Sequence, residues 1–85
     1  MENTISDKIR VINSKDLDME LFIEPVAETI KISAGKNYTF IAKGVSSPEG
    51  FDIEFSENGI IVHMPPNSGN LEVYDENNNL VYKLD

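Results

Sequence analysis

The chain has 85 residues and a mass of 9.5 kDa, a size that accommodates one domain over residues 1–85. Fifteen acidic residues outnumber seven basic ones, so the net charge of −8 disfavours binding to nucleic acid or to anionic membrane surfaces. The sequence contains no cysteine, which excludes disulfides, thiolate metal sites and thiol nucleophiles. A hydrophobic fraction of 40% is typical of a folded globular chain.

Two further features bear on the location of the protein. No apolar run approaches the roughly 20 residues that a membrane helix needs. Residues 1–4 lack the basic start and apolar stretch of a secretory signal. Since the absence of cysteine also fits a reducing compartment, we expect a soluble, cytoplasmic protein that does not bind membranes.

The N-terminal segment admits two interpretations. Ile5, Ile9 and Ile12 have helical spacing, whereas Ile9–Ile12 also reads as a strand followed by a polar turn over 13–16. The strand is favoured because the alternating segment 17–23 would then pair with it as a hairpin. A frayed tail or a short helix over residues 1–7 stays open.

Alternation of apolar and polar residues continues along the middle of the chain. Segment 17–23 has Leu17, Met19, Leu21 and Ile23 on one face, and Pro25 ends it. Segments 29–33 and 38–43 are also predicted strands, separated by a glycine-containing turn over 34–37. A turn-rich connector follows over 44–50.

The C-terminal third predicts two hairpins. In 51–56, Phe51, Ile53 and Phe55 should face the core, and Asn58-Gly59 should turn the chain into the strand 60–64. Pro65-Pro66 ends that strand. Segments 71–74 and 80–84 form the second hairpin around a polar turn over 75–79, with Leu80, Tyr82 and Leu84 facing inward.

Together these segments predict an all-β domain of seven to eight short strands. Regularly spaced strands with turn residues between them are typical of a small antiparallel β-sandwich or a partly open barrel, with Greek-key or meander connections. We expect no long helix.

The sequence offers little that would support catalysis or metal binding. His63 is the only histidine, so neither a histidine metal site nor a catalytic constellation is indicated around it. Oxygen-bearing side chains at Asp75, Asn77 and Asn79 partly fit a calcium loop, but Leu80 occupies the place of the glycine that such a loop needs. We therefore interpret 75–79 as a solvated turn, and we expect no enzyme activity and no cofactor.

Apolar residues on both faces of several strands indicate a protein-contact surface. A strand of a sandwich buries one face, so additional apolar residues on the other face favour a partner or a second copy of the chain. The candidate contact residues are Phe22, Ile41, Ile61, Tyr74 and Val81. We therefore predict a non-catalytic binding module that uses a sheet edge or its end loops, with homo-oligomers as one form.

The acidic balance supports an alternative function. An inhibitor or immunity-type protein could block the basic active site of a partner, because opposite charges accelerate association. The acidic residues expected to face outward are Asp52, Glu54, Glu57, Glu72, Asp75 and Glu76.

Overall fold

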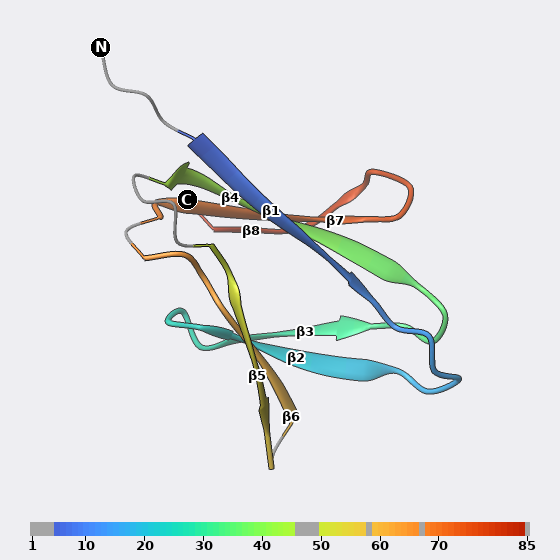
Figure 1. Cartoon of the computed structure of the whole chain (residues 1–85). Helices are drawn as coiled ribbons and strands as arrows, with labels where there is room; N and C mark the ends of the chain where they lie inside the picture. The colour runs from blue at the N-terminus through green and yellow to red at the C-terminus, as the bar shows by residue number, and fades with distance from the viewer. Residues whose placement is uncertain (1–4, 46–49, 58, 67, 85) are drawn as a thin grey trace.

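The computed structural model describes residues 5–45, 50–57, 59–66 and 68–84. These residues form eight strands in two four-stranded sheets, with no helix among them (Figure 1). The predicted all-β sandwich is therefore confirmed, and the two sheets do not close into a barrel.

The first sheet has the strand order β1-β4-β7-β8. Its strands are β1 (Ile5–Ile12), β4 (Asn37–Val45), β7 (Asn70–Asp75) and β8 (Leu80–Leu84). All three pairings are antiparallel, and β1 and β8 are the edges.

The second sheet has the strand order β3-β2-β6-β5. Its strands are β3 (Glu28–Ile32), β2 (Met19–Glu24), β6 (Gly59–His63) and β5 (Asp52–Ser56). The β2–β6 pairing is parallel and the other two are antiparallel, so β3 and β5 are the edges.

The two C-terminal hairpins, β5–β6 and β7–β8, are confirmed, but the pairing predicted near the N-terminus is wrong. β1 pairs with β4, and β2 pairs with β3 in the opposite sheet. The chain therefore crosses between the sheets after Ile12 instead of turning back on itself. Residues 5–7 belong to β1, which rules out a helix there, and residues 1–4 lie outside the described part of the chain.

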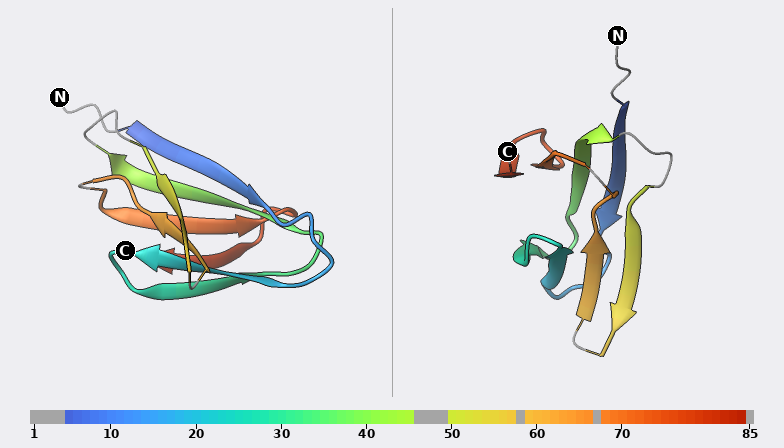
Figure 2. Two further views of the ribbon diagram at one scale, coloured as in Figure 1. Left: turned by 60° about the horizontal axis from the view of Figure 1, so that its bottom comes forward. Right: turned by 90° about the vertical axis from the view of Figure 1, so that its left-hand side faces the viewer.

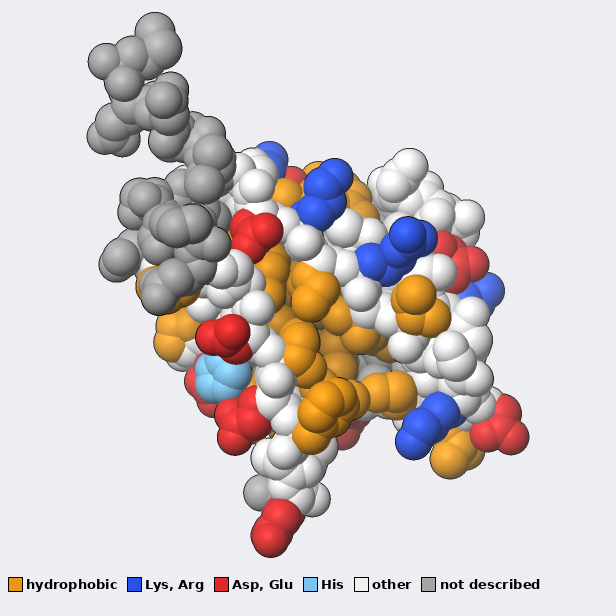
Figure 3. Space-filling model, in the orientation of Figure 1, with side chains coloured by type: hydrophobic (Ala, Val, Ile, Leu, Met, Phe, Trp, Pro, Cys, Tyr) orange, Lys and Arg blue, Asp and Glu red, His pale blue; other side chains and the backbone are white. Residues whose placement is uncertain are grey.

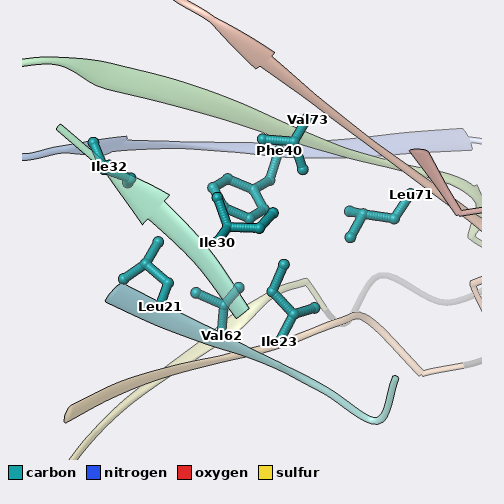
Figure 4. Packing of buried hydrophobic residues seen from close by; sticks show 8 residues of the cluster. All are labelled: Leu21, Ile23, Ile30, Ile32, Phe40, Val62, Leu71 and Val73. Atoms are coloured by element: carbon teal, nitrogen blue, oxygen red, sulfur yellow. The ribbon is translucent and has the colours of Figure 1, made fainter. Parts of the chain in front are cut away.

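The core lies between the two sheets and takes its side chains from both (Figure 4). Alternation within each strand directs these residues to the same side of their sheet, where they are buried. The buried cluster comprises Leu21, Ile23, Ile30, Ile32 and Val62 from the second sheet, with Phe40, Leu71 and Val73 from the first.

Asn13 stabilises the segment that leads from β1 in the first sheet to β2 in the second. It is 1% exposed, directly after β1. Its Nδ2 donates toward the carbonyl oxygens of Leu17 at 2.8 Å, Ile32 at 3.0 Å and Ser33 at 3.2 Å. Its Oδ1 accepts from the Lys15 amide, and its own amide donates to the Lys36 carbonyl. One side chain thus joins the end of β1 to the end of β3.

Two predicted core assignments are wrong. Ile53 and Phe55 are 38% and 80% exposed, although they point to the inner side of the second sheet beside Val62 and Ile60. The β5–β6 hairpin extends beyond the first sheet, so its inner side has no opposing layer there (Figure 2). Phe51, predicted with them, does pack against the core.

Leu80 also departs from its predicted position and is 49% exposed. A register shift between Val73 and Tyr74 pairs Leu80 with Tyr74 rather than with an inward residue. Leu17, predicted inside a strand, precedes β2 and is exposed, whereas Tyr82 and Leu84 pack against the core as predicted.

Candidate functional site

An apolar groove with a volume of about 650 Å³ lies between the two sheets. From β1 it is lined by Ile9, Val11 and Ile12. From the second sheet it is lined by the apolar side chains of Met19, Ile53, Phe55 and Ile60. We call this feature the β1–β5 groove.

The groove exists because two sheet edges face each other there. In the described part of the chain, β1 pairs only with β4 and β5 pairs only with β6. Each edge strand therefore presents one side of its backbone that makes no ladder hydrogen bonds within the sheets. Exposed edges of this kind are sites at which another chain can add.

Phe55 is the most exposed of the large apolar side chains in the groove. Burying a phenylalanine from water stabilises a structure by about 1.5–3 kcal/mol, a gain that this side chain does not obtain within its own chain. Ile12 and Ile53 are also exposed beside it. A continuous apolar surface of this type marks an interaction site more often than isolated exposed residues do.

Charged residues of opposite sign flank the groove (Figure 3). On the β1 side, Lys8 and Arg10 lie on the strand and Lys15 follows it, with Arg10 and Lys15 reaching the groove lining. On the β5 side lie the exposed carboxylates of Asp52 and Glu54, and Glu57 follows the strand. Asp7 on β1 and Asp16 after Lys15 accompany the three basic residues, so the β1 rim carries a small net positive charge. The β5 rim is acidic, and apolar surface lies between the two rims.

His63 takes part in the acidic rim. Its Nε2 lies 2.8 Å from Glu54 Oε1, and in the β5–β6 register it stands opposite Asp52. Among the described residues, no group of three or more His, Asp or Glu side chains could hold a metal ion. The contact orients Glu54 along the outer side of the second sheet.

The structure separates the five predicted contact residues. Phe22 and Ile61 are register partners on the outer face of the second sheet, both half-buried. Ile41, Tyr74 and Val81 lie on the outer face of the first sheet. The five residues thus occupy opposite faces of the sandwich, and none of them lines the β1–β5 groove.

Tyr74 is held within its own sheet. Its hydroxyl donates to Glu72 Oε1 at 2.8 Å, and Lys43 Nζ lies 3.2 Å from the same oxygen. The Tyr74 hydrogen bond and the Lys43 ammonium lower the pKa of Glu72. The same carboxylate raises the pKa of Tyr74. These side chains form a polar cluster across β4 and β7.

The turn between β7 and β8 is built around Asp75. Asp75 Oδ1 accepts hydrogen bonds from the amides of Asn77 and Asn79, both at 2.9 Å. The Asn79 amide is the main cause of the lowered pKa of Asp75. Asn78 has a φ of 65°, which Asn tolerates well. The predicted polar turn is confirmed, and its carboxylate stabilises the turn itself.

Sequence reasoning did not identify the groove. Alternation correctly placed Ile53 and Phe55 on the inner side of their strand, but it assigned them to the core. The groove depends on β5 being an edge strand beyond the opposing sheet, and no local pattern encodes that position. Ile12 gave no separate signal, because it reads as the last apolar residue of a strand.

Comparison with protein-family models, with curated proteins and with solved structures found no match to this chain. A search of the described residues for a helix long and apolar enough to cross a membrane also found none. The groove and its charged rims therefore carry the functional interpretation.

Proposed function

We propose that this chain is a small, soluble, cytoplasmic and non-catalytic protein-binding module, and that its contact surface is the β1–β5 groove. The observation that carries the proposal is an apolar hollow of about 650 Å³ with Phe55 80% exposed on its wall. A suitable partner is a protein surface with apolar side chains at its centre, acidic residues that face the β1 rim and basic residues that face the β5 rim.

The composition of the groove supports binding rather than catalysis. Its described polar lining comes from Arg10, Ser14, Lys15 and Ser56, with no Asp, Glu or His among the lining residues. Proton transfer needs a group that gains and loses a proton near neutral pH within reach of the reacting atoms. An apolar surface between two open sheet edges instead favours association with another chain.

A photo-crosslinking experiment tests this proposal. A photoreactive phenylalanine analogue replaces Phe55 in one variant and Val81 in the other, since Val81 is 44% exposed on the outer face of the first sheet. We expect a discrete adduct with a protein only from position 55 when each variant is irradiated in its host cells. No adduct from position 55, or equal adducts from both positions, would overturn the proposal.

The outer face of the second sheet supports the second candidate function, an acidic inhibitor. The residues on that face include Glu20, Glu24, Asp52 and Glu54, set around Phe22 and Ile61. Of the six acidic residues expected to face outward, Glu72 and Asp75 belong to β7 in the other sheet, and Glu76 lies in the turn after β7. An inhibitor would therefore use the second sheet alone.

This second candidate predicts strongly salt-dependent binding. We expect wild-type protein to bind a cationic nuclease at low salt, to lose affinity as salt is added, and to lose it with Glu20→Lys and Glu24→Lys combined. A variant with Lys31→Glu, on the same sheet, serves as the charge control. An affinity that changes neither with salt concentration nor with the lysine substitutions would exclude this function.

A further inference from the structure

We propose that the occupant of the β1–β5 groove is a second copy of this chain, joined by a two-fold axis so that each copy places Phe55 in the groove of the other. This inference rests on the proposed function, because it names the partner of the same groove. In a two-fold interface, the same surface of each copy meets itself, so the surface must be complementary to itself. The β1–β5 groove meets that condition in three respects.

The first respect is the apolar surface. Phe55 projects from β5 next to a hollow whose opposite wall consists of Ile9, Val11 and Ile12 from β1. A second copy turned about a two-fold axis brings its own Phe55 against that wall. Each groove thus receives an aromatic side chain, the residue type that most often anchors a protein interface.

The second respect is the charge on the rims. The described ion pairs join no residue of the β1 rim to one of the β5 rim within the chain. A two-fold axis that runs along the groove exchanges the rims, so the net positive β1 side of each copy faces the acidic β5 side of the other. In this arrangement Arg10 of each copy faces Asp52 of the other, and the same attraction occurs twice.

The third respect is the position of the sheet edges. Both strands that border the groove are edges, and both approach one side of the molecule (Figures 1 and 2). The same association covers both edges at once. Such cover is one way in which β proteins avoid uncontrolled edge-to-edge aggregation.

The charge pattern also separates a second copy from other macromolecules. Nucleic acids and anionic membranes would be attracted by Lys8, Arg10 and Lys15 but repelled by Asp52, Glu54 and Glu57 across the same groove. A copy of this chain offers both signs in the matching order. The structure thus favours self-association.

The mass in solution provides the first test. We expect the wild-type chain to behave as a particle of twice 9.5 kDa at micromolar concentration in sedimentation equilibrium. Phe55→Ser should raise the dimer dissociation constant about 30-fold or more, the effect typical of an interface anchor. Leu80→Ser, which removes an exposed apolar side chain on β8, should leave it unchanged. Circular dichroism of all three proteins confirms that each is folded.

A charge exchange provides the second and sharper test. Arg10→Glu and Asp52→Lys each place like charges opposite one another, so each variant alone should be monomeric at concentrations where the wild type is dimeric. In an equimolar mixture, the new glutamate of one variant faces the new lysine of the other, while Asp52 of the first faces Arg10 of the second. We therefore expect dimers only in the mixture.

The outcomes separate this inference from the proposed function. A wild-type monomer at high micromolar concentration, or single-charge variants that dimerise as well as the wild type, would overturn the two-fold dimer. If crosslinking from position 55 then captured a different protein, the binding function would stand with another partner. If it captured none, both proposals would fail.

Discussion

Asn13 shows how much a single polar residue can decide in a domain with a thin core. Its amide group joins the segment after β1 to the end of β3, and all of its hydrogen-bonding atoms have partners. A buried amide is tolerated only when its donors and acceptors are satisfied. The side chain thereby stabilises the crossing that takes the chain from one sheet to the other.

The substitution Asn13→Asp tests this role. It replaces a donor with a carboxylate oxygen that would face the carbonyls of Leu17 and Ile32, so we expect a loss of about 3 kcal/mol or more in the free energy of unfolding at pH 7. Burial raises the pKa of the introduced acid, so the variant should regain stability as the pH falls and the acid becomes protonated. Urea unfolding at pH 7 and at pH 4 measures both effects.

Asn70→Asp introduces the same acid at an exposed position and serves as the control for that experiment. It should change stability little at either pH. Equal losses from the two substitutions would contradict a specific role for Asn13.

Gly59 and Gly69 differ in what their backbones require. Gly59 has a φ of 133°, and a Cβ there would lie 3.3 Å from Cε2 of Phe22. Gly69 has no atom within 4 Å of a Cβ position and no such backbone constraint. We expect Gly59→Ala to lower the free energy of unfolding by about 1–3 kcal/mol.

By contrast, Gly69→Ala should be neutral or stabilise by up to about 1 kcal/mol, because it restricts only the unfolded chain. Thermal unfolding of the two variants beside the wild type gives the comparison. Similar behaviour of the two would show that the Gly59 backbone is not under strain.

At the scale of elements, the two predicted hairpins illustrate what local sequence can specify. β7–β8 forms around a turn in which Asp75 accepts the amides of Asn77 and Asn79. β5–β6 forms at the Asn58-Gly59 signal, of which Asn58 lies outside the described residues. Both hairpins join neighbouring strands, so the information that they need lies within a few residues.

The β7–β8 turn predicts a pH dependence of stability. Because hydrogen bonds lower the folded-state pKa of Asp75, its contribution is fully present above its ordinary pKa of 3.8. That contribution is lost as the pH falls through the lowered folded pKa. In Asp75→Asn, which keeps an acceptor but does not titrate, this part of the acid destabilisation should disappear.

Urea unfolding between neutral pH and strongly acidic pH measures the difference between wild type and Asp75→Asn. Asp16→Asn, outside the strands, provides a matched change of charge. If the free energy of unfolding of Asp75→Asn fell at acidic pH as steeply as that of the wild type, the proposed contribution of the turn would be contradicted.

Across the whole molecule, the sandwich is well packed on one side and open on another. Phe40 lies in the middle of the buried cluster, whereas Phe55 stands on the open side. The same residue type therefore serves two purposes, since burial stabilises the fold at one position and exposure provides a contact at the other.

This contrast predicts that the same substitution lowers the free energy of unfolding by different amounts at Phe40 and at Phe55. Phe40→Ala should lower the free energy of unfolding by about 3–5 kcal/mol, a large share of the stability of a domain of this size. Phe55→Ala, at protein concentrations where the chain is monomeric, should change it by less than about 0.5 kcal/mol. Chemical denaturation of both variants checks the comparison. A large loss for Phe55→Ala in the monomer would mean that its groove position is structural.

Local sequence patterns were sufficient to predict the fold class, most strand positions and the two C-terminal hairpins. Alternation has a period of two residues, and turns such as 75–79 act over a short span, so both can be recognised from neighbouring residues. The sequence also predicted Tyr82 and Leu84 on the inner side, where both pack against the core.

Three features could be learned only from the folded chain: which strands are edges, where the chain changes sheets and which apolar residues stay exposed to water. Alternation indicates that Phe55 and Ile53 point the same way as a core residue, but it does not indicate whether another sheet lies opposite them. That depends on pairings between distant segments, such as β1 with β4 and β2 with β6. The β1–β5 groove and its charged rims arise from those pairings, because side chains far apart in the chain line a common surface only after both sheets have formed.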